Sequence, residues 1–142
     1  MNVQEIMTSS PICGTPETSL HDIARMMVEN DCGCIPIVEN EDTKKPVGMI
    51  TDRDIVVRTV AENDNPQHFH AKHIMTKNIA TVSPETSVED CCKIMEGKQI
   101  RRIAVVDENG ALCGMVSQAD IANNASTEKT AQVVQEVSKT AA

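Results

Sequence analysis

Two short segments of the chain place a hydroxyl and a carboxylate at the same spacing. Thr51 is followed three residues later by Asp54, and Ser117 is followed in the same way by Asp120. A carboxylate one turn into a helix can accept hydrogen bonds from two neighbouring hydroxyl groups of a ligand. A hydroxyl beside the unpaired N–H groups of a helix N-terminus can hold a phosphate oxygen. The two segments are therefore candidate ligand-binding segments.

The same spacing also has a purely structural interpretation. A Ser or Thr at the start of a helix, with an acidic residue three positions later, is a variant of the capping box. Ser19 with Asp22, and Ser87 with Asp90, have this spacing in front of amphipathic patterns. Because all four predicted helices begin in this way, the spacing alone does not distinguish a helix cap from a ligand contact.

The segments recur because the chain contains an internal repeat, which is the first feature to settle when predicting an architecture. Residues 3–38 match residues 71–106 at 11 of 36 positions. After a turn that is two residues shorter in the second copy, residues 48–55 match residues 114–121 at four of eight positions. The chain is therefore two copies of one unit.

Each copy predicts a brief extended stretch, a helix, two strands and a second helix. The apolar residues at helical spacing are Leu20, Ile23, Ala24, Met27 and Val28 in the first copy, and Val88, Cys91, Cys92 and Met95 in the second. Runs of β-branched residues at 35–38 and 103–106 favour buried strands, and Asn109-Gly110 favours a hairpin after the second run. The predicted fold class is α+β (α/β), with two β-α-β-β-α repeats and small sheets packed with helices.

The repeat also predicts the domain organisation. The first copy covers residues 1–61 and the second covers residues 71–125, with a polar linker at 62–70. Residues 126–142 resume a helical pattern with Ala131, Val134 and Val137 on one side. This C-terminal tail is too weakly apolar to be stable alone, so we expect it to pack on the module or on a second subunit.

Composition argues against several classes of function. The 13 basic and 21 acidic residues give a net charge of −8, which disfavours non-specific binding of nucleic acid. One Phe, no Trp and no Tyr leave no aromatic platform for stacking bases. No apolar run approaches the roughly 20 residues that a membrane span needs, and the first residues do not resemble a secretory signal. We expect a cytoplasmic protein with neither nucleic-acid nor membrane partners.

Cysteine and histidine residues are the candidates for thiol or metal chemistry. The six cysteines do not form the paired C-x-x-C spacing of a structural zinc site, and Cys91 and Cys92 are predicted to be small buried hydrophobic residues. His68, His70 and His73 could together hold zinc or nickel, although a loop gives them no fixed geometry. Solvated linker histidines and reduced thiols are the simpler expectation.

No catalytic motif is present in the sequence. The chain contains no nucleophile elbow, no phosphate-binding loop of the Walker type, no His-Glu-x-x-His and no Gly-x-Gly-x-x-Gly. The sequence therefore favours a binding module over an enzyme.

The repeated unit resembles the cystathionine-β-synthase (CBS) domain pair, also called the Bateman module. The resemblance covers residues 3–122 and is carried by Ile-Met-Thr, Pro-Glu-Thr-Ser and the twin Gly-x-x-Thr/Ser-x-x-Asp endings at 48–54 and 114–120. The short layout is similar to that of small stand-alone bacterial two-CBS proteins. The resemblance implies two units about a pseudo-two-fold axis, with two clefts that in many members hold AMP, ADP, ATP, S-adenosylmethionine or NAD.

The resemblance also implies which residues would contact such a ligand. The two aspartates would hold the ribose, the two hydroxyl residues would lie near the phosphate, and arginines would neutralise it. The adenine would lie against apolar side chains and strand backbone, since no aromatic side chain is available. The implied contact residues are Thr51, Asp54, Ser117, Asp120, Arg101, Arg102, Arg53, Ile35 and Ile103.

The two clefts are not expected to be equivalent. Gly33 and Cys34 occupy the positions in the first copy that Arg101 and Arg102 occupy in the second. The basic pair therefore exists once, and one cleft is expected to be weaker or empty.

The expected function is a regulatory, ligand-sensing module that binds an adenosine nucleotide and requires no cofactor. The resemblance implies a homodimer formed through helices. More apolar residues than one helix face needs lie at Ile55, Val56, Val57 and Val60. An effector protein that responds to the ligand is a further expected partner. The alternatives are a structural or protein-interaction module without a physiological nucleotide and, with less support, a thiol or metal sensor.

Overall fold

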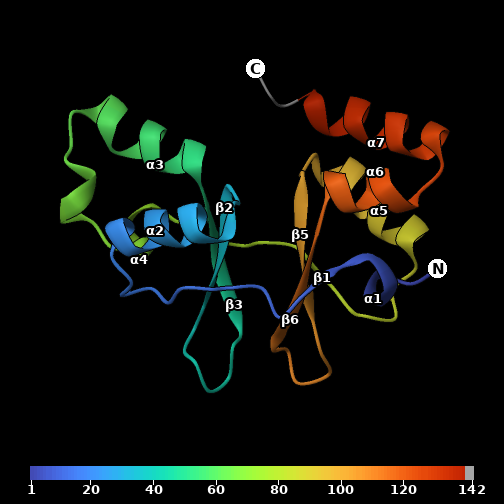
Figure 1. Cartoon of the computed structure of the whole chain (residues 1–142), viewed down its shortest axis with the longest axis horizontal. Helices are drawn as coiled ribbons and strands as arrows, with labels where there is room; N and C mark the ends of the chain where they lie inside the picture. Colours follow the sequence, from blue (N-terminus) through green and yellow to red (C-terminus); the bar gives the residue numbers. More distant parts are fainter. Residues whose placement is uncertain (140–142) are drawn as a thin grey trace. The chain divides into compact units, whose positions relative to one another are not determined.

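The computed structural model describes residues 1–139, which form two compact units (Figure 1). The first-repeat unit is the continuous segment Ile12–Ile79, and the second-repeat unit joins Met1–Pro11 to the chain from Ala80 onward. Each unit has its own hydrophobic core beneath its own helices. The mixed α/β fold with two repeats and small sheets agrees with the sequence prediction.

The second-repeat unit is built on a four-stranded sheet in the order β1-β6-β5-β4. Strands β4 and β5 are parallel, whereas β5 with β6 and β1 with β6 are antiparallel. The elements of this unit are α1 (Val3–Ile6), β1 (Thr8–Ser9), β4 (Thr81–Val82), α5 (Val88–Lys98), β5 (Arg102–Val106), β6 (Leu112–Ser117), α6 (Gln118–Asn124) and α7 (Thr127–Ser138).

The turn between β5 and β6 follows the predicted hairpin. The side chain of Asp107 accepts hydrogen bonds from the N–H groups of Asn109 and Ala111, at 2.9 and 3.0 Å. Gly110 adopts a φ of +78°, which a residue with a side chain rarely does. The backbone of this turn therefore favours the glycine of the predicted Asn-Gly pair.

The first-repeat unit has the same plan with weaker sheet edges. Its sheet contains β2 and β3, and single bridges Gly14–Ile37 and Met49–Thr76 take the places of the β4–β5 and β1–β6 pairs. The elements are α2 (Leu20–Asn30), β2 (Cys34–Val38), β3 (Pro46–Thr51), α3 (Asp52–Arg58), the short 3₁₀ helices η1 (Val60–Glu62) and η2 (Pro66–His68), and α4 (Ala71–Ile74).

Each unit takes its edge segment from the other copy of the repeat. The Ile-Met-Thr segment at 74–76 pairs with β3, while the Ile-Met-Thr segment at 6–8 leads into β1 and pairs with β6. A Cβ at Gly48 would lie 2.7 Å from Sδ of Met75, and Gly114 is covered in the same way by Met7. The ranges 1–61 and 71–125 thus describe the sequence repeat, whereas the compact units exchange their first segments.

The predicted helix stripes are mostly buried. All four residues predicted in α5 are buried, but in α2 the side chain of Val28 is 67% exposed. The prediction for Val28 was wrong because no described element of the first-repeat unit covers that side of α2. The equivalent position of α5 is Glu96, which lies beneath α7.

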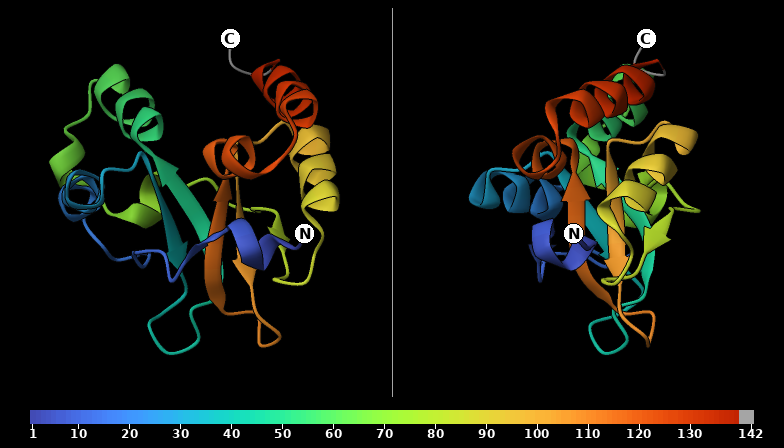
Figure 2. Two further views of the ribbon diagram at one scale, coloured as in Figure 1. Left: turned by 45° about the vertical axis from the view of Figure 1, so that its right-hand side comes forward. Right: turned by 90° about the vertical axis from the view of Figure 1, so that its right-hand side faces the viewer.

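The C-terminal helix α7 packs on α5 and α6 (Figure 2). Val133 and Val137 enter the core, and Nζ of Lys129 lies 3.0 Å from a carboxylate oxygen of Glu96. The expectation that the tail packs on the module is therefore confirmed for residues 127–138. The predicted apolar side was partly wrong, because Ala131 and Val134 are exposed.

The segment predicted as a linker is attached to the first-repeat unit. The N–H of Leu20 donates to the carbonyl of Phe69 at 3.0 Å, and the N–H of Ala71 donates to the carbonyl of Thr18 at 2.8 Å. These bonds hold the chain from residue 69 onward against the start of α2. Among residues 1–139, no helix combines the length and the apolar character needed to cross a membrane.

Candidate functional site

Each unit contains one candidate half-site, where the second strand of its hairpin turns into a helix. The first half-site is Thr51 with Asp54, at the junction of β3 and α3, and the second half-site is Ser117 with Asp120, at the junction of β6 and α6. All four side chains are half-buried. Thus both predicted hydroxyl–carboxylate pairs lie at equivalent places in the fold.

Both pairs form complete capping boxes. At the first half-site, Oγ1 of Thr51 accepts from the N–H of Asp54 at 3.1 Å, and Oδ2 of Asp54 accepts from the N–H of Thr51 at 3.0 Å. At the second, Oγ of Ser117 accepts from the N–H of Asp120 at 3.2 Å, and Oδ2 of Asp120 accepts from the N–H of Ser117 at 2.9 Å. In each case the backbone cap uses one of the two carboxylate oxygens.

The other two Ser-x-x-Asp segments make only half of this arrangement. The hydroxyls of Ser19 and Ser87 accept from the N–H groups of Asp22 and Asp90, at 3.1 and 3.0 Å. The two carboxylates are exposed and do not form the reciprocal bond to the cap. Asp54 and Asp120 therefore differ from Asp22 and Asp90 in orientation, although the sequence spacing is identical.

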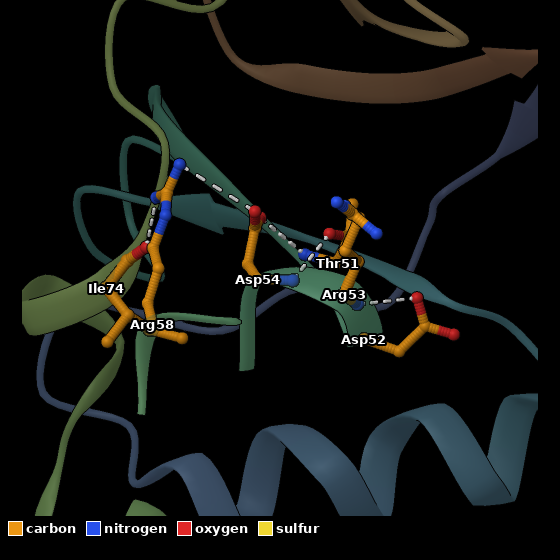
Figure 3. A network of polar contacts seen from close by, with 6 residues as sticks. All are labelled: Thr51, Asp52, Arg53, Asp54, Arg58 and Ile74. Atoms are coloured by element: carbon orange, nitrogen blue, oxygen red, sulfur yellow. Dashed lines mark hydrogen bonds and ion pairs between the residues drawn. The ribbon is translucent and has the colours of Figure 1, made fainter. Parts of the chain in front are cut away.

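At the first half-site the remaining carboxylate oxygen faces an arginine (Figure 3). Oδ1 of Asp54 lies 3.7 Å from Nη2 of Arg58, and Nη1 of Arg58 donates to the carbonyl oxygen of Ile74 at 2.6 Å. Arg58 is not among the contact residues that the resemblance implies. Its position four residues after Asp54 was the available signal, because such residues are neighbours on a helix surface.

At the second half-site the remaining oxygen has no such partner. The residue equivalent to Arg58 is Asn124, and its side-chain amide donates to the backbone carbonyl of Asp120 at 2.7 Å. Within the described residues, Oδ1 of Asp120 makes no hydrogen bond or ion pair. The two carboxylates are therefore alike in capping and different in what faces their second oxygen.

The predicted arginine pair lies beside the second half-site. Arg102 is the direct cross-strand partner of Ser117, and the carbonyl of Arg101 accepts from the N–H of Gln118 at 3.1 Å. Arg101 is exposed and Arg102 is half-buried. The pairing of β5 with β6 thus brings both arginines to the end of β6, where Ser117 and Asp120 lie.

At the first half-site an acidic side chain occupies the corresponding region. Cys34 is the cross-strand partner of Thr51, and a Cβ at Gly33 would lie 3.0 Å from Oδ2 of Asp52. Oδ1 of Asp52 accepts from the N–H of Arg53, whose own side chain is exposed on α3. The charge next to the strand is therefore negative in the first copy and positive in the second.

The apolar wall expected for an adenine ring is not formed by the predicted side chains. Ile35 and Ile103 are fully buried and belong to the cores of their respective units. Because side chains alternate along a strand, these two point away from the other sheet face. At these positions only strand backbone remains for a ring contact.

The cysteine and histidine residues do not assemble into a metal centre within residues 1–139, where no group of three or more potential ligands is suitably placed. Nδ1 of His73 accepts from the N–H of His70 at 2.9 Å, so this ring nitrogen caps the start of α4. Burial raises the pKa of the Cys91 thiol to about 12 and also raises the pKa of Cys92. The prediction that these two cysteines are buried hydrophobic residues is confirmed.

Comparison with known proteins supports the resemblance seen in the repeat. The family model described as CBS domain matches residues 3–60 and 71–126. The uncharacterized protein MK0525 of Methanopyrus kandleri is 36% identical over 121 residues, which cover 85% of this chain and 61% of that protein. The chain thus spans less than two thirds of that relative.

Hypoxic response protein 1 of Mycobacterium tuberculosis is similar over nearly the whole length of both chains. It is 31% identical over 134 residues, covering 94% of this chain and 92% of that protein. Its crystal structure, described with two coordinated zinc ions, gives a TM-score of 0.78 at 32% identity, covering 89% of this chain and all of that one.

The CBS domain pair of protein MJ0100 has been solved in complex with 5′-methylthioadenosine and S-adenosyl-L-methionine. It gives a TM-score of 0.75 at 26% identity, covering 87% of this chain and 98% of that one.

Proposed function

Since the chain belongs to the CBS domain family and carries a tandem pair of these domains, we propose that it is a regulatory module that binds an adenosine-containing ligand. The bound molecule is a signal in this proposal, and the chain performs no reaction on it. The ligands of the MJ0100 domain pair, both adenosine derivatives, support this class of ligand.

One observation carries the proposal: the second carboxylate oxygen of Asp120. Oδ2 caps the helix, whereas Oδ1 has no hydrogen-bond or ion-pair partner among the described residues. The side chain is half-buried and held by its cap, so its orientation is set before a ligand arrives. A fixed carboxylate with a free oxygen suits the vicinal hydroxyls of a ribose, which donate in pairs.

The neighbouring groups suit the phosphate of a nucleotide. Arg101 and Arg102 supply positive charge at the edge that carries Ser117. An arginine guanidinium presents several N–H donors in a plane that matches phosphate oxygens. In an acidic protein, two adjacent arginines next to a buried strand are consistent with binding of an anion. We propose the second half-site as the main nucleotide contact.

The competing view is that both aspartates serve only as caps, and that the module acts by docking to another protein. Conservative substitution separates the two functions, because Asn retains a carbonyl oxygen that can accept from the N–H of Ser117. Asp120→Asn should therefore preserve the fold and lose the charge-assisted contact to ribose. Asp90→Asn is the matched control, since Asp90 follows a serine cap at the same spacing without the reciprocal bond.

Calorimetric titration with AMP and ATP, supported by thermal shift, tests the proposal. We expect Asp120→Asn to weaken binding by about tenfold to a hundredfold, the range for hydrogen bonds to a charged group, and Asp90→Asn to leave affinity unchanged. Unaltered affinity in Asp120→Asn and in the Asp54→Asn, Asp120→Asn double variant would reduce both carboxylates to caps. The docking function would then be the better interpretation.

We also propose that the module is a homodimer that uses α3. Val56, Val57 and the following Val60 are 56, 42 and 56% exposed, although the fold does not demand valine there. The equivalent positions of the second repeat are Ala122, Asn123 and Ser126. Exposed apolar side chains on α3 and the adjoining η1 favour burial against a second copy of the chain.

Sedimentation at micromolar concentration tests the assembly. We expect a species of about twice the 15.4 kDa chain mass, converted to the monomer by Val56→Glu. Val134→Glu, on the exposed side of α7, is the control that should remain dimeric. A wild-type protein that sediments as a monomer would contradict the proposed dimer.

A further inference from the structure

Arg58 connects two groups that belong to different parts of the first-repeat unit. One nitrogen of its guanidinium donates to the carbonyl oxygen of Ile74 at 2.6 Å, and another lies 3.7 Å from Oδ1 of Asp54 (Figure 3). The first contact is a short hydrogen bond from a charged donor, and the second is a longer ion pair. The guanidinium is therefore anchored on Ile74 while it faces the carboxylate.

Ile74 is a firm anchor for this side chain. It is the last residue of α4, is 4% exposed, and belongs to the core of the first-repeat unit. The chain continues into Thr76, which exchanges two backbone hydrogen bonds with Met49, at 3.0 and 2.9 Å. The carbonyl of Ile74 is thus fixed by the buried side chain of Ile74 and by the bonds of Thr76. Arg58 cannot turn away from Asp54 without losing its hydrogen bond to this carbonyl.

The second repeat has no arginine that makes the equivalent two contacts among its described residues. Asn124 stands in place of Arg58, and its amide bonds to the backbone of Asp120 rather than to the carboxylate. The position equivalent to Ile74 is Ile6, at the end of α1 in the second-repeat unit. The backbone framework is thus repeated, while the cation is present in one copy.

From this difference we infer that Arg58 sets the order in which the two half-sites take a ribose. This inference rests on the proposed function and assigns a specificity-determining residue to it. A ribose whose hydroxyls donate to the carboxylate needs the oxygen that the helix cap leaves free. At Asp120 the second oxygen is available, whereas at Asp54 it faces a guanidinium that Ile74 holds in place. The second half-site therefore fills first, and the first half-site fills only as the contact between Asp54 and Arg58 is given up.

Occupation of the first half-site should also affect the contact between two helices. Arg58 links α3, which carries Asp54, to α4, whose sequence belongs to the second copy of the repeat. Occupation of the first half-site changes the environment of Arg58. It should therefore alter the hydrogen bond by which Arg58 of α3 contacts Ile74 of α4. Occupation of the second half-site has no equivalent effect, because within residues 1–139 Asn124 bonds to the carbonyl of Asp120 and makes no bond to α1.

Exchange of the two equivalent residues tests the inference. Adenosine is the probe, because it has the ribose hydroxyls and lacks a phosphate that arginine would attract. Asp120→Asn isolates the first half-site, and Asp54→Asn isolates the second. In the first background we expect Arg58→Asn to tighten adenosine binding by about threefold to tenfold, the equivalent of one ordinary hydrogen bond. In the second background Asn124→Arg should weaken binding by a similar factor.

Arg25→Asn is the matched control, since Arg25 forms an exposed ion pair with Glu29 at the same four-residue spacing on α2. It should leave adenosine affinity unchanged in both backgrounds. Amide hydrogen exchange of the ligand-free protein provides a second measurement. Residues 71–76 should exchange faster in Arg58→Asn and at the wild-type rate in Arg25→Asn.

The possible failures are distinguishable. Adenosine affinity that responds to Asp54→Asn and Asp120→Asn, but to neither Arg58→Asn nor Asn124→Arg, would overturn the role of Arg58 and leave the proposed function intact. Affinity that ignores both aspartate substitutions would overturn the proposed function and this inference with it. Unchanged exchange of residues 71–76 in Arg58→Asn would show that the bond to Ile74 is not an anchor.

Discussion

At the scale of single residues, capping a helix and binding a ligand are compatible roles for one carboxylate. Asp54 and Asp120 each use Oδ2 for the backbone and present Oδ1 elsewhere. The two carboxylates differ in the group that faces Oδ1, although they belong to the same motif.

The pKa of a buried thiol likewise depends on its surroundings. The Cys91 side chain is 1% exposed in the core, and burial raises its pKa to about 12.

The raised pKa of Cys91 predicts a loss of stability at alkaline pH. In the unfolded chain the thiol ionises near pH 9, whereas the folded protein keeps the proton up to about pH 12. The contribution to stability is therefore complete below pH 9 and falls as pH rises toward 12, by about 1.4 kcal/mol per pH unit. Between pH 8 and pH 10.5 the free energy of unfolding in urea should fall by about 2 kcal/mol more in the wild type than in Cys91→Ala. Equal losses in the two proteins would contradict the prediction.

At the scale of elements, the two repeats differ most in what covers their helices. Helix α7 covers α5 and α6 with Val133 and Val137 and with the ion pair between Lys129 and Glu96. The first-repeat unit has no helix in the corresponding role among its described elements. Val28 of α2, at the position equivalent to Glu96, is therefore exposed, although a regular apolar stripe predicted its burial.

The packing of α7 predicts which of its valines matter for stability. Val133 is 1% exposed and lies in the core, so Val133→Ala should lower the free energy of unfolding by about 1–3 kcal/mol through lost burial and a residual cavity. Val134 is 40% exposed, so Val134→Ala should change it by no more than about 0.5 kcal/mol. Urea unfolding measures both variants. Similar losses would mean that the other side of α7 is also buried.

At the scale of the whole molecule, the chain forms two units that exchange their first segments. Residues 1–11 complete the unit of the second repeat, and residues 71–79 complete the unit of the first. Ile6 and Ile74 are equivalent in the repeat, yet each is buried in the core of the opposite copy. The exchange makes each unit depend on residues that are remote from it in the repeat.

Two equivalent substitutions should therefore act on opposite units. Ile74→Ala should reduce amide protection mainly in residues 12–70, and Ile6→Ala should reduce it mainly in residues 80–139. Loss of a buried isoleucine typically costs about 2–5 kcal/mol, which is enough to raise exchange in the affected unit. Hydrogen exchange by mass spectrometry gives the distribution. Effects confined to 80–139 for Ile74→Ala would show that the units follow the repeat.

Much of this protein could be predicted from its sequence alone. The repeat, the helix caps, the hairpin at Asn109-Gly110 and the buried strands all depend on residues close together in the chain, so local patterns reveal them. The candidate aspartates and the arginine pair could be named for the same reason, because register and spacing carry them to one sheet edge. The family resemblance followed from those same motifs.

Other features were decided only by tertiary structure. Periodicity shows that a side of a helix is apolar, but burial also needs a covering element, as Val28 and Val134 show. The exchange of the Ile-Met-Thr segments could not be predicted, because a repeat does not specify which copy completes which sheet. The same exchange brings the carbonyl of Ile74 to Arg58, sixteen residues away in the chain. Two half-sites with one motif thus become different through a contact that depends on how distant segments pack.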